Sequence, residues 1–488
     1  MLANIIVLLP FLVALAMLIM PQKRLKSISI LMSIALLGLS VFAYNMYKID
    51  RSHPILSSKV SWIKNLNSNW FLDIDGMSML MVLLTAFVSP LIFLSIREER
   101  KDSNGFFALI WTMIGAMLGV FTAKDGLLFY VFWELALIPI YFICLMWGGE
   151  HKEKITFKFF IYTLFGSLFM LASLLYLYQH SQSGWEIGAL YEAGRSLSAT
   201  EQNWVFWGLF LGFAIKMPIF PFHTWQADTY NVAPTTGTML LSGIMSKMGT
   251  YGLIRWLVPM LPAGFANNAK LAIILSVITI VYASCIALVQ KDMKRLMAWS
   301  SVAHIGLISA GIFSFTPEGI NGAFAQMFAH GVNVVGLFFI VDIIINRSHT
   351  DQINALGGIR GKSPVFALYF LIILLGSVAL PLTNGFVGEF LLLTGVFKYN
   401  FWLSMIAGLT VILGAVYMLR SYQNSMLGET NALTSKFTDL HINEKLVFIL
   451  ITVLIFVFGL FPNILIDLVS PGVEAIMNNN LSTKEIIQ

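Results

Sequence analysis

Long apolar segments with almost no charge recur along the whole chain. The 488 residues are 58% hydrophobic and only 11% charged, with a mean hydropathy of +0.80. A helix that crosses a bilayer needs about 20 consecutive apolar residues, and no water-soluble domain of this length needs such a composition. We therefore predict an all-α polytopic membrane protein with about fourteen transmembrane helices. The expected spans are 2–20, 27–47, 77–96, 105–122, 126–148, 155–178, 204–222, 232–257, 271–290, 296–313, 319–345, 364–397, 402–419 and 444–468.

Several features exclude other classes of protein. The first apolar run begins almost at Met1 and lacks a basic start and a small-residue cleavage site, so we expect it to be retained as a span. Cys144 and Cys285 lie inside apolar runs, which predicts two buried thiols and neither a disulfide framework nor an iron–sulfur motif. Basic residues are scattered in short loops, which argues against nucleic acid as a partner. The chain has no recognisable nucleotide-binding or metal-binding motif.

Lysine and arginine are distributed unequally between alternating loops. One set of loops holds 18 of the 30 basic residues and the other side holds 10. Cytoplasmic loops retain positive charge, so both termini are predicted to face the outer, periplasmic side. The absence of a transit peptide favours the inner membrane of a bacterial cell. The two remaining basic residues, Lys216 and Lys247, fall inside predicted spans.

Ionisable residues inside the spans are costly, because a charge at mid-membrane costs about 2.5 to 3.5 kcal/mol. Such a residue persists by pairing, by contact with water or because it has a function, and a purely structural ion pair is the alternative for each one alone. Burial favours the neutral form of lysine and glutamate, whereas proximity of the two favours both charged forms, and histidine suits a proton relay. Together these residues predict a proton path. They are Glu134, Lys216, Lys247, His304, His330 and Glu389.

Proline is expected to break two spans beside these charges. Pro218 follows Lys216, and Pro381 precedes Glu389. Proline removes a helix hydrogen bond, and broken helices at membrane depth are where transporters place ion sites, although a simple packing kink is the alternative. Two other charged residues, Arg255 and Asp342, lie near span ends and are expected to reach the interface.

The two broken spans, the seventh and the twelfth, are five positions apart. This odd shift predicts two five-helix repeats of inverted topology, spans 4–8 and 9–13. The expected domains are 1–104 with three N-terminal spans, 105–258 with the first repeat, 269–428 with the second repeat, and 429–488 with the last span and tail.

The expected mechanism is a switch followed by a relay. A nearby Glu134 would let Lys216 hold its proton, and separation of the pair would release that proton toward Lys247. From there it would pass through water and the two histidines to Glu389.

Five segments are similar to those of a known family, the antiporter-like subunits of complex I, which are related to subunits of multisubunit sodium/proton antiporters and membrane-bound hydrogenases. These segments are FWELALIPIYFICLMWGG, GFAIKMPIFPFHTW, APTTGTMLLSGIMSKMGTYGLIR, QKDMKRLMAWSSVAHIGLISAG and NGFVGEF. After HTW the family usually continues with Leu-Pro-Asp-Ala-His, whereas residues 226–230 read QADTY, so the resemblance does not support a proton-uptake role for that loop.

The resemblance also implies roles for the ionisable residues. Glu134 and Lys216 would form the coupling pair, Lys247 would connect the halves, and Glu389 would be the distal exit residue. His304 and His330 fall where the family places relay histidines. A glutamate at the broken twelfth span, where lysine is common in the family, is similar to one branch of it.

By this resemblance the chain is expected to be a proton-translocating membrane subunit of a respiratory NADH:quinone oxidoreductase. It would have no cofactor or metal of its own, and partner subunits would hold the flavin and the iron–sulfur clusters. Its partners would be other membrane subunits, including neighbouring antiporter-like subunits, and lipids. The alternatives are a subunit of a multisubunit cation/proton antiporter or membrane-bound hydrogenase, and a scaffold whose buried charges only hold helices together.

Overall fold

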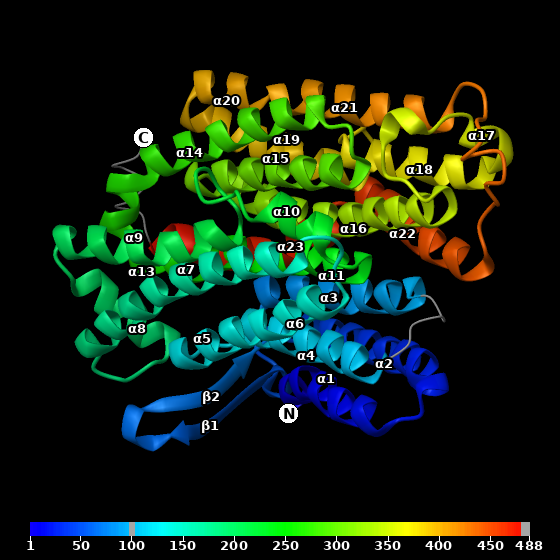
Figure 1. The fold of residues 1–488 in the computed structure, drawn as a ribbon. Helices are drawn as coiled ribbons and strands as arrows, with labels where there is room; N and C mark the ends of the chain where they lie inside the picture. Colours follow the sequence, from blue (N-terminus) through cyan, green and yellow to red (C-terminus); the bar gives the residue numbers. More distant parts are fainter. Residues whose placement is uncertain (97–102, 480–488) are drawn as a thin grey trace. The chain divides into compact units, whose positions relative to one another are not determined.

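The computed structural model describes residues 1–96 and 103–479 (Figure 1). Four basic residues used in the orientation argument, Arg97, Arg100, Lys101 and Lys484, lie outside the described residues.

Long apolar helices dominate the described chain, which confirms the all-α polytopic class. Eleven of them are long and apolar enough to cross a membrane. They are α1 (Leu2–Ile19), α2 (Gln22–Ile49), α3 (Gly76–Ser95), α4 (Ser103–Thr122), α5 with α6 (Gly126–Leu135 and Leu137–Trp147), α7 (Lys152–His180), α14 (Pro262–Val289), α15 (Met293–Phe313), α16 (Pro317–Ser348), α20 with α21 (Phe401–Ala407 and Leu409–Met426) and α22 (Ile442–Leu460).

The three expected spans that are absent from this set, 204–222, 232–257 and 364–397, are interrupted or divided into shorter pieces. The pieces are α9 (Ala199–Lys216), α10 (Gln226–Val232), α11 (Thr235–Leu240), η3 (Leu241–Met245), α12 (Ser246–Gly252), η4 (Leu253–Leu257), α13 (Val258–Met260), α18 (Pro364–Ser377) and α19 (Asn384–Tyr399). The segments η3 and η4 are π-helical. The structure therefore confirms both predicted breaks, one directly after Lys216 and one shortly before Glu389. The total of fourteen spans and the inverted repeats remain predictions.

The remaining described elements are short or lie at the end of the chain. They are α8 (Ile187–Ser196), α17 (Ile359–Lys362), α23 (Asn463–Asn479) and the 3-10 turns η1 (Pro54–Leu56), η2 (Lys64–Leu66) and η5 (Ile353–Ala355).

A β-hairpin, which the sequence analysis does not predict, connects α2 to α3. Strands β1 (Ser57–Ile63) and β2 (Ser68–Asp73) pair antiparallel, with an irregularity between Ser61 and Ile63. Asp125 anchors the hairpin, because its carboxylate accepts hydrogen bonds from the Asn69 backbone N–H at 2.8 Å and from the Ser68 hydroxyl at 3.0 Å. The same carboxylate caps the N-terminus of α5.

Contacts between the elements divide the chain into two compact units. Among the described residues, the first unit comprises 1–96, 103–217, 244–272 and 467–479, and the second comprises 218–243 and 273–466. Within the first unit, α1 packs along α4 and α7 along α9. Within the second, α16 packs against α15 and α19. Of the long apolar helices, α3 and α4 in the first unit and α15 and α16 in the second are the most buried.

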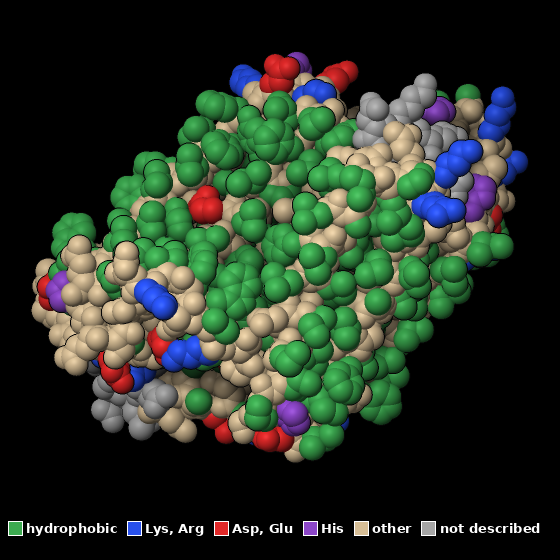
Figure 2. Space-filling view, turned by 90° about the horizontal axis from the view of Figure 1, so that it is seen from below, with side chains coloured by type: hydrophobic (Ala, Val, Ile, Leu, Met, Phe, Trp, Pro, Cys, Tyr) green, Lys and Arg blue, Asp and Glu red, His purple; other side chains and the backbone are tan. Residues whose placement is uncertain are grey.

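The outer helices of the first unit present apolar side chains outward. Leu12 of α1 and Leu31 of α2 are each 64% exposed. Hydrophobic side chains cover most of the face in Figure 2, and charged residues gather toward its margins. Such a surface requires lipid rather than water as its solvent. The expected burial of Cys144 is confirmed, but that of Cys285 is wrong, because this thiol lies on the exposed side of α14.

The close packing of α7 on α9 depends on glycine. A Cβ atom added at Gly212 would lie 2.9 Å from Cβ of Met170 and 3.1 Å from the carbonyl oxygen of Gly166. We expect Gly212→Leu to push α9 away from α7 and to lower the free energy of unfolding by about 1 to 3 kcal/mol. The measurement is thermal denaturation of the purified protein in mild detergent.

The matched control is Gly38→Leu on α2, where an added Cβ meets nothing within 4 Å. Equal losses of stability in the two variants would contradict the role assigned to this contact.

Candidate functional site

Lys216 ends helix α9 and is 3% exposed. The next turn cannot continue the helix, because Pro218 has no N–H and restricts the residue before it. The carbonyl end of a helix favours a cation, so α9 stabilises the ammonium in its last turn. The Lys216 ammonium lies 4.9 Å from the centre of the Trp133 ring, which is a cation–π contact.

Glu134, next to Trp133 in α5, lies within electrostatic range of Lys216. The described residues show no direct ion pair between the two side chains. The carboxylate instead hydrogen-bonds to Tyr130, one turn earlier in the same helix, and its Oε1 is buried without a hydrogen-bond partner among the described residues. Glu134 and Lys216 therefore interact electrostatically, but no direct ion pair fixes the distance between them.

Lys247 lies on α12, between the two π-helical segments, and is 1% exposed. Helix α12 packs against α9, and Gly249 permits the close approach. A Cβ atom at Gly249 would lie 2.9 Å from Cβ of Met217 and 2.9 Å from the carbonyl oxygen of Phe213. The first unit thus packs the helix that carries Lys247 against the end of the helix that carries Lys216.

In the second unit, Glu389, His304 and Gln326 meet at one point. The Nδ1 atom of His304 lies 2.9 Å from Oε1 of Glu389, and Gln326 donates a hydrogen bond of 3.3 Å to the same oxygen. The three side chains come from α15, α16 and α19 and are all buried. The ring of His330 lies 5.7 Å from that of His304, measured between ring centres.

A small polar cavity adjoins this cluster and has room for about one water molecule. It is called the inner cavity below. Its polar lining residues are Ser300, Ser301, His304, Gln326, His330, Asn333 and Ser377. Oxygen atoms of Ser301, Gln326 and Asn333 are buried there without a hydrogen-bond partner among the described residues. Buried polar atoms of this kind are normally satisfied by ordered water.

The structure brings the six predicted residues together in two groups. Glu134, Lys216 and Lys247 belong to the first unit, and the two histidines belong with Glu389 to the second. Three amide side chains near the second group were not predicted from the sequence. They are Gln326, Asn333 and Asn384. Gln326 contacts Glu389, and Asn333 donates a hydrogen bond of 3.0 Å to Asn384 at the start of α19. Amides in membrane helices carry no charge, so no charge anomaly marks them in the sequence.

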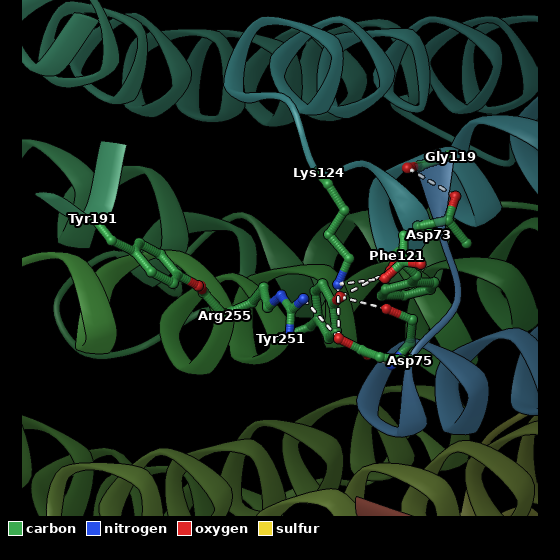
Figure 3. Close-up of polar contacts among 10 residues, drawn as sticks. Asp73, Asp75, Gly119, Phe121, Lys124, Tyr191, Tyr251 and Arg255 are labelled. Atoms are coloured by element: carbon green, nitrogen blue, oxygen red, sulfur yellow. Dashed lines mark hydrogen bonds and ion pairs between the residues drawn. The ribbon is translucent and has the colours of Figure 1, made fainter. Parts of the chain in front are cut away.

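A cluster of ion pairs around Asp75 was also missed (Figure 3). The Oδ2 atom of Asp75 lies 2.7 Å from the Lys124 ammonium and 2.6 Å from the Arg255 guanidinium. Asp73 lies 3.8 Å from the same ammonium, and Tyr191 donates a hydrogen bond of 2.5 Å to the carbonyl oxygen of Arg255. The acidic pair Asp73 and Asp75, directly before the third span, is the signal in the sequence that could have indicated this cluster.

The cluster continues through hydroxyl groups toward Lys247. Asp75 caps α3 by accepting the N–H of Ser78, and the Ser78 hydroxyl lies 3.0 Å from that of Tyr251. Tyr251 also donates a hydrogen bond of 2.8 Å to the carbonyl oxygen of Phe121. Tyr251 lies four residues after Lys247 on α12, which places both on the same side of the helix.

Arg255 and Asp342 are each bound by another side chain. Arg255 is 13% exposed and binds Asp75, which directly precedes α3. Asp342 is half-buried and accepts a hydrogen bond of 2.6 Å from Thr235. Their position at the membrane interface stays a prediction.

This arrangement defines a class: a helical membrane transport protein whose ionisable groups lie beside breaks in its helices. Residues 123–414 match the family described as NADH:quinone oxidoreductase/Mrp antiporter, TM. The chain belongs to this family. It is 40% identical over 438 residues to NADH-quinone oxidoreductase subunit M of Rickettsia conorii, covering 89% of each chain.

The structural comparisons agree with this assignment. The structure resembles a chain of respiratory complex I from Thermus thermophilus with a TM-score of 0.91 and 31% identity, covering 98% of this chain and 100% of the other. It shares its fold with a chain of the Mrp complex from Dietzia sp., with a TM-score of 0.84 and 16% identity, covering 100% of both. The resemblance to the antiporter-like subunits of complex I is confirmed, and so is the assignment to the subunit M branch that rests on Glu389.

The carboxylate of Asp75, which Lys124 and Arg255 share, should contribute strongly to the stability of the fold. We expect Asp75→Asn to lower the free energy of unfolding by about 3 to 5 kcal/mol, because two nearly buried cations lose their counter-charge. Denaturation of the purified protein in mild detergent measures the loss. Asp50→Asn is the matched control, since Asp50 is exposed and its carboxylate accepts hydrogen bonds from the neighbouring Ser52. A loss no larger than that of the control would show that the cluster does not stabilise the fold.

The cluster also predicts a pH dependence of stability. Burial, aided by the neighbouring Asp75 carboxylate, raises the pKa of Asp73 to about 6 from its usual 3.8. The folded protein then binds this proton more tightly than the unfolded chain, so stability falls as pH rises from about 4 to about 6. We expect Asp73→Asn to gain thermal stability relative to the parent over this interval, measured as melting temperatures at pH 4, 5, 6 and 7. A difference that stays constant with pH would contradict the assignment.

Proposed function

We propose that this chain is a proton-translocating membrane subunit of a NADH:quinone oxidoreductase in the inner membrane of a bacterial cell. One observation carries the proposal: both broken helices hold a buried ionisable group beside the break, Lys216 in the first unit and Glu389 in the second. The subunit M relatives and the resemblance to a complex I chain support it.

In the first unit, the protonation state of Lys216 depends on its distance from Glu134 and on its burial. The Glu134 carboxylate favours the ammonium form, and burial opposes it. No direct ion pair holds the two side chains at a fixed distance within the described residues. Movement of Glu134 therefore decides whether Lys216 keeps its proton or releases it toward Lys247, whose helix packs against α9.

In the second unit, the two groups that would exchange a proton are already close together. The Nδ1 atom of His304 lies 2.9 Å from Oε1 of Glu389 but is not aligned for a hydrogen bond, so a turn of the imidazole ring would let a proton pass between nitrogen and oxygen. Gln326 orients the carboxylate by donating to the same oxygen. A water molecule in the inner cavity can join His330 to the pair, and Glu389 then delivers the proton to the outer side.

The energy for this transport comes from partner subunits. Moving one charge against 100 mV requires about 2.3 kcal/mol. We assign the flavin, the iron–sulfur clusters and the quinone site to other chains of the complex, and we assign other membrane subunits, including antiporter-like neighbours, and lipids as the contacts of this one. Both termini face the outer side of the membrane in this proposal.

Neutral replacements at the two breaks test the proposal. We expect Lys216→Ala and Glu389→Gln each to lower NADH-driven proton translocation into sealed vesicles by roughly tenfold or more, equivalent to about 1.4 kcal/mol or more in the barrier. Lys23→Ala, which removes an exposed charge in the first turn of α2, is the matched control. Co-purified flavin shows whether the complex has assembled. Parental translocation in an assembled Lys216→Ala complex would overturn the proposal.

A cation/proton antiporter is the second candidate, because the family includes the Mrp antiporters. It predicts proton flux that depends on sodium and continues without NADH. Purification of the chain with other hydrophobic subunits but without flavin would favour this candidate.

A further inference from the structure

A second cavity lies in the second unit beside the loops at the ends of α14 and α21. It has a volume of about 270 Å³. It is called the outer cavity below because it opens to the protein surface, and the name does not refer to the outer side of the membrane. Its polar lining residues are Gln290, Lys291, Asn354, Tyr417, Arg420, Ser421 and Asn424. Lys291, Asn354 and Arg420 are exposed, so the cavity meets the surface on the side of these basic loops.

Tyr417 connects the outer cavity to the inner one. Its side chain is 1% exposed and lines the outer cavity, and its hydroxyl donates a hydrogen bond of 3.1 Å to the hydroxyl of Ser300. Ser300 lines the inner cavity together with His304 and His330. A single pair of hydroxyl groups therefore joins the two spaces.

Unsatisfied hydroxyl groups lie on both sides of this pair. Ser421, one turn after Tyr417 on α21, lines the outer cavity, and Ser301, next to Ser300 on α15, lines the inner one. The oxygen atoms of both serines are buried without a hydrogen-bond partner among the described residues. Since buried hydroxyls are normally satisfied, the two serines indicate water on each side of Tyr417 and Ser300.

We infer that Tyr417 and Ser300 form a hydroxyl relay that carries protons from the outer cavity to His304 and Glu389. This inference rests on the proposed function and adds a proton inlet for the second unit. A hydroxyl can donate one hydrogen bond while it accepts another. When Tyr417 accepts a proton from water in the outer cavity, its own proton passes to Ser300, and the Ser300 proton passes on into the inner cavity. Each O–H bond broken is replaced by a new one, so neither residue keeps a net charge.

The same arrangement selects protons over metal cations. Lys291 and Arg420 line the outer cavity, and their charge opposes the entry of sodium and of hydronium alike, so it does not select between them. The hydrogen-bonded pair beyond them transmits a proton by exchange of O–H bonds, which a metal ion cannot use. The relay therefore favours proton transport without sodium.

Removal of one hydroxyl group tests the relay. We expect Tyr417→Phe to lower the number of protons translocated per NADH severalfold while the assembled complex retains its flavin and its NADH:quinone reductase activity. Tyr422→Phe is the matched control on the same helix, because the Tyr422 hydroxyl donates to the carbonyl oxygen of Ala367 at 3.3 Å instead. Parental translocation in Tyr417→Phe, in a complex where Lys216→Ala abolishes it, would overturn the relay and leave the proposed function standing.

Variants at Ser300 separate the relay from a structural role. Ser300→Ala should reproduce the loss, and Ser300→Thr, which keeps a hydroxyl, should restore translocation. The double variant with Tyr417→Phe should lose no more than either single variant, because both act on one route. Losses that add, or an equal loss in Ser300→Thr, would overturn the relay.

The side on which the outer cavity opens can be measured separately. In a Cys285→Ser background, which removes the exposed thiol, we expect Asn424→Cys to react with a membrane-impermeant maleimide from the side of the basic loops. Reaction only from the opposite side would overturn the inlet.

Discussion

The cost of holding an ionisable group away from water is the constraint on which the rest of this structure depends. The protein meets this cost in three ways. A helix end and an aromatic ring stabilise the Lys216 ammonium, and a shared carboxylate, Asp75, neutralises two cations near the hairpin. A histidine and an amide surround the carboxylate of Glu389. Of these three arrangements, the Asp75 cluster is the one in which a single carboxylate oxygen contacts both a lysine and an arginine. In the proposed function, the other two arrangements leave the group able to exchange a proton.

The breaks in the helices leave backbone groups without helical hydrogen bonds and require unusual backbone conformations. Residues of the second unit accommodate both. After the first break, the backbone N–H of Phe220 donates a hydrogen bond of 2.9 Å to Thr279. At the second, Ala379 and Leu382 adopt the left-handed conformation, with φ of 57° and 75°, which side chains other than glycine rarely occupy. Such residues persist only where the surrounding packing fixes them, and Gly459 permits a very close approach to the Leu382 carbonyl. The breaks are thus rigid parts of the fold.

The sequence was sufficient to predict most spans, both breaks and the burial of Lys216, Lys247, His304, His330 and Glu389, whereas Glu134 is only partly buried. Proline inside a span and a charge inside a span are visible without any knowledge of the fold. The hairpin and the Asp75 cluster were missed because their pairing joins residues far apart in the chain, and the side chains look like ordinary loop residues. Tyr417 and Ser300 were missed because hydroxyl groups cost little in a membrane helix and so give no signal. The exposure of Cys285 depends on the orientation of α14, which its uniformly apolar sequence does not specify.

The π-helical segments on both sides of α12 have a mechanical consequence. Each holds more residues per turn than an α-helix, and the surplus residue can move along the chain by exchange of backbone hydrogen bonds. Transfer of one residue across α12 turns that short helix by about 100° about its axis and moves it by about 1.5 Å along the axis. Lys247 and Tyr251 lie on the same side of α12 and turn together. Such a turn would give Lys247 new neighbours without displacing a whole transmembrane helix.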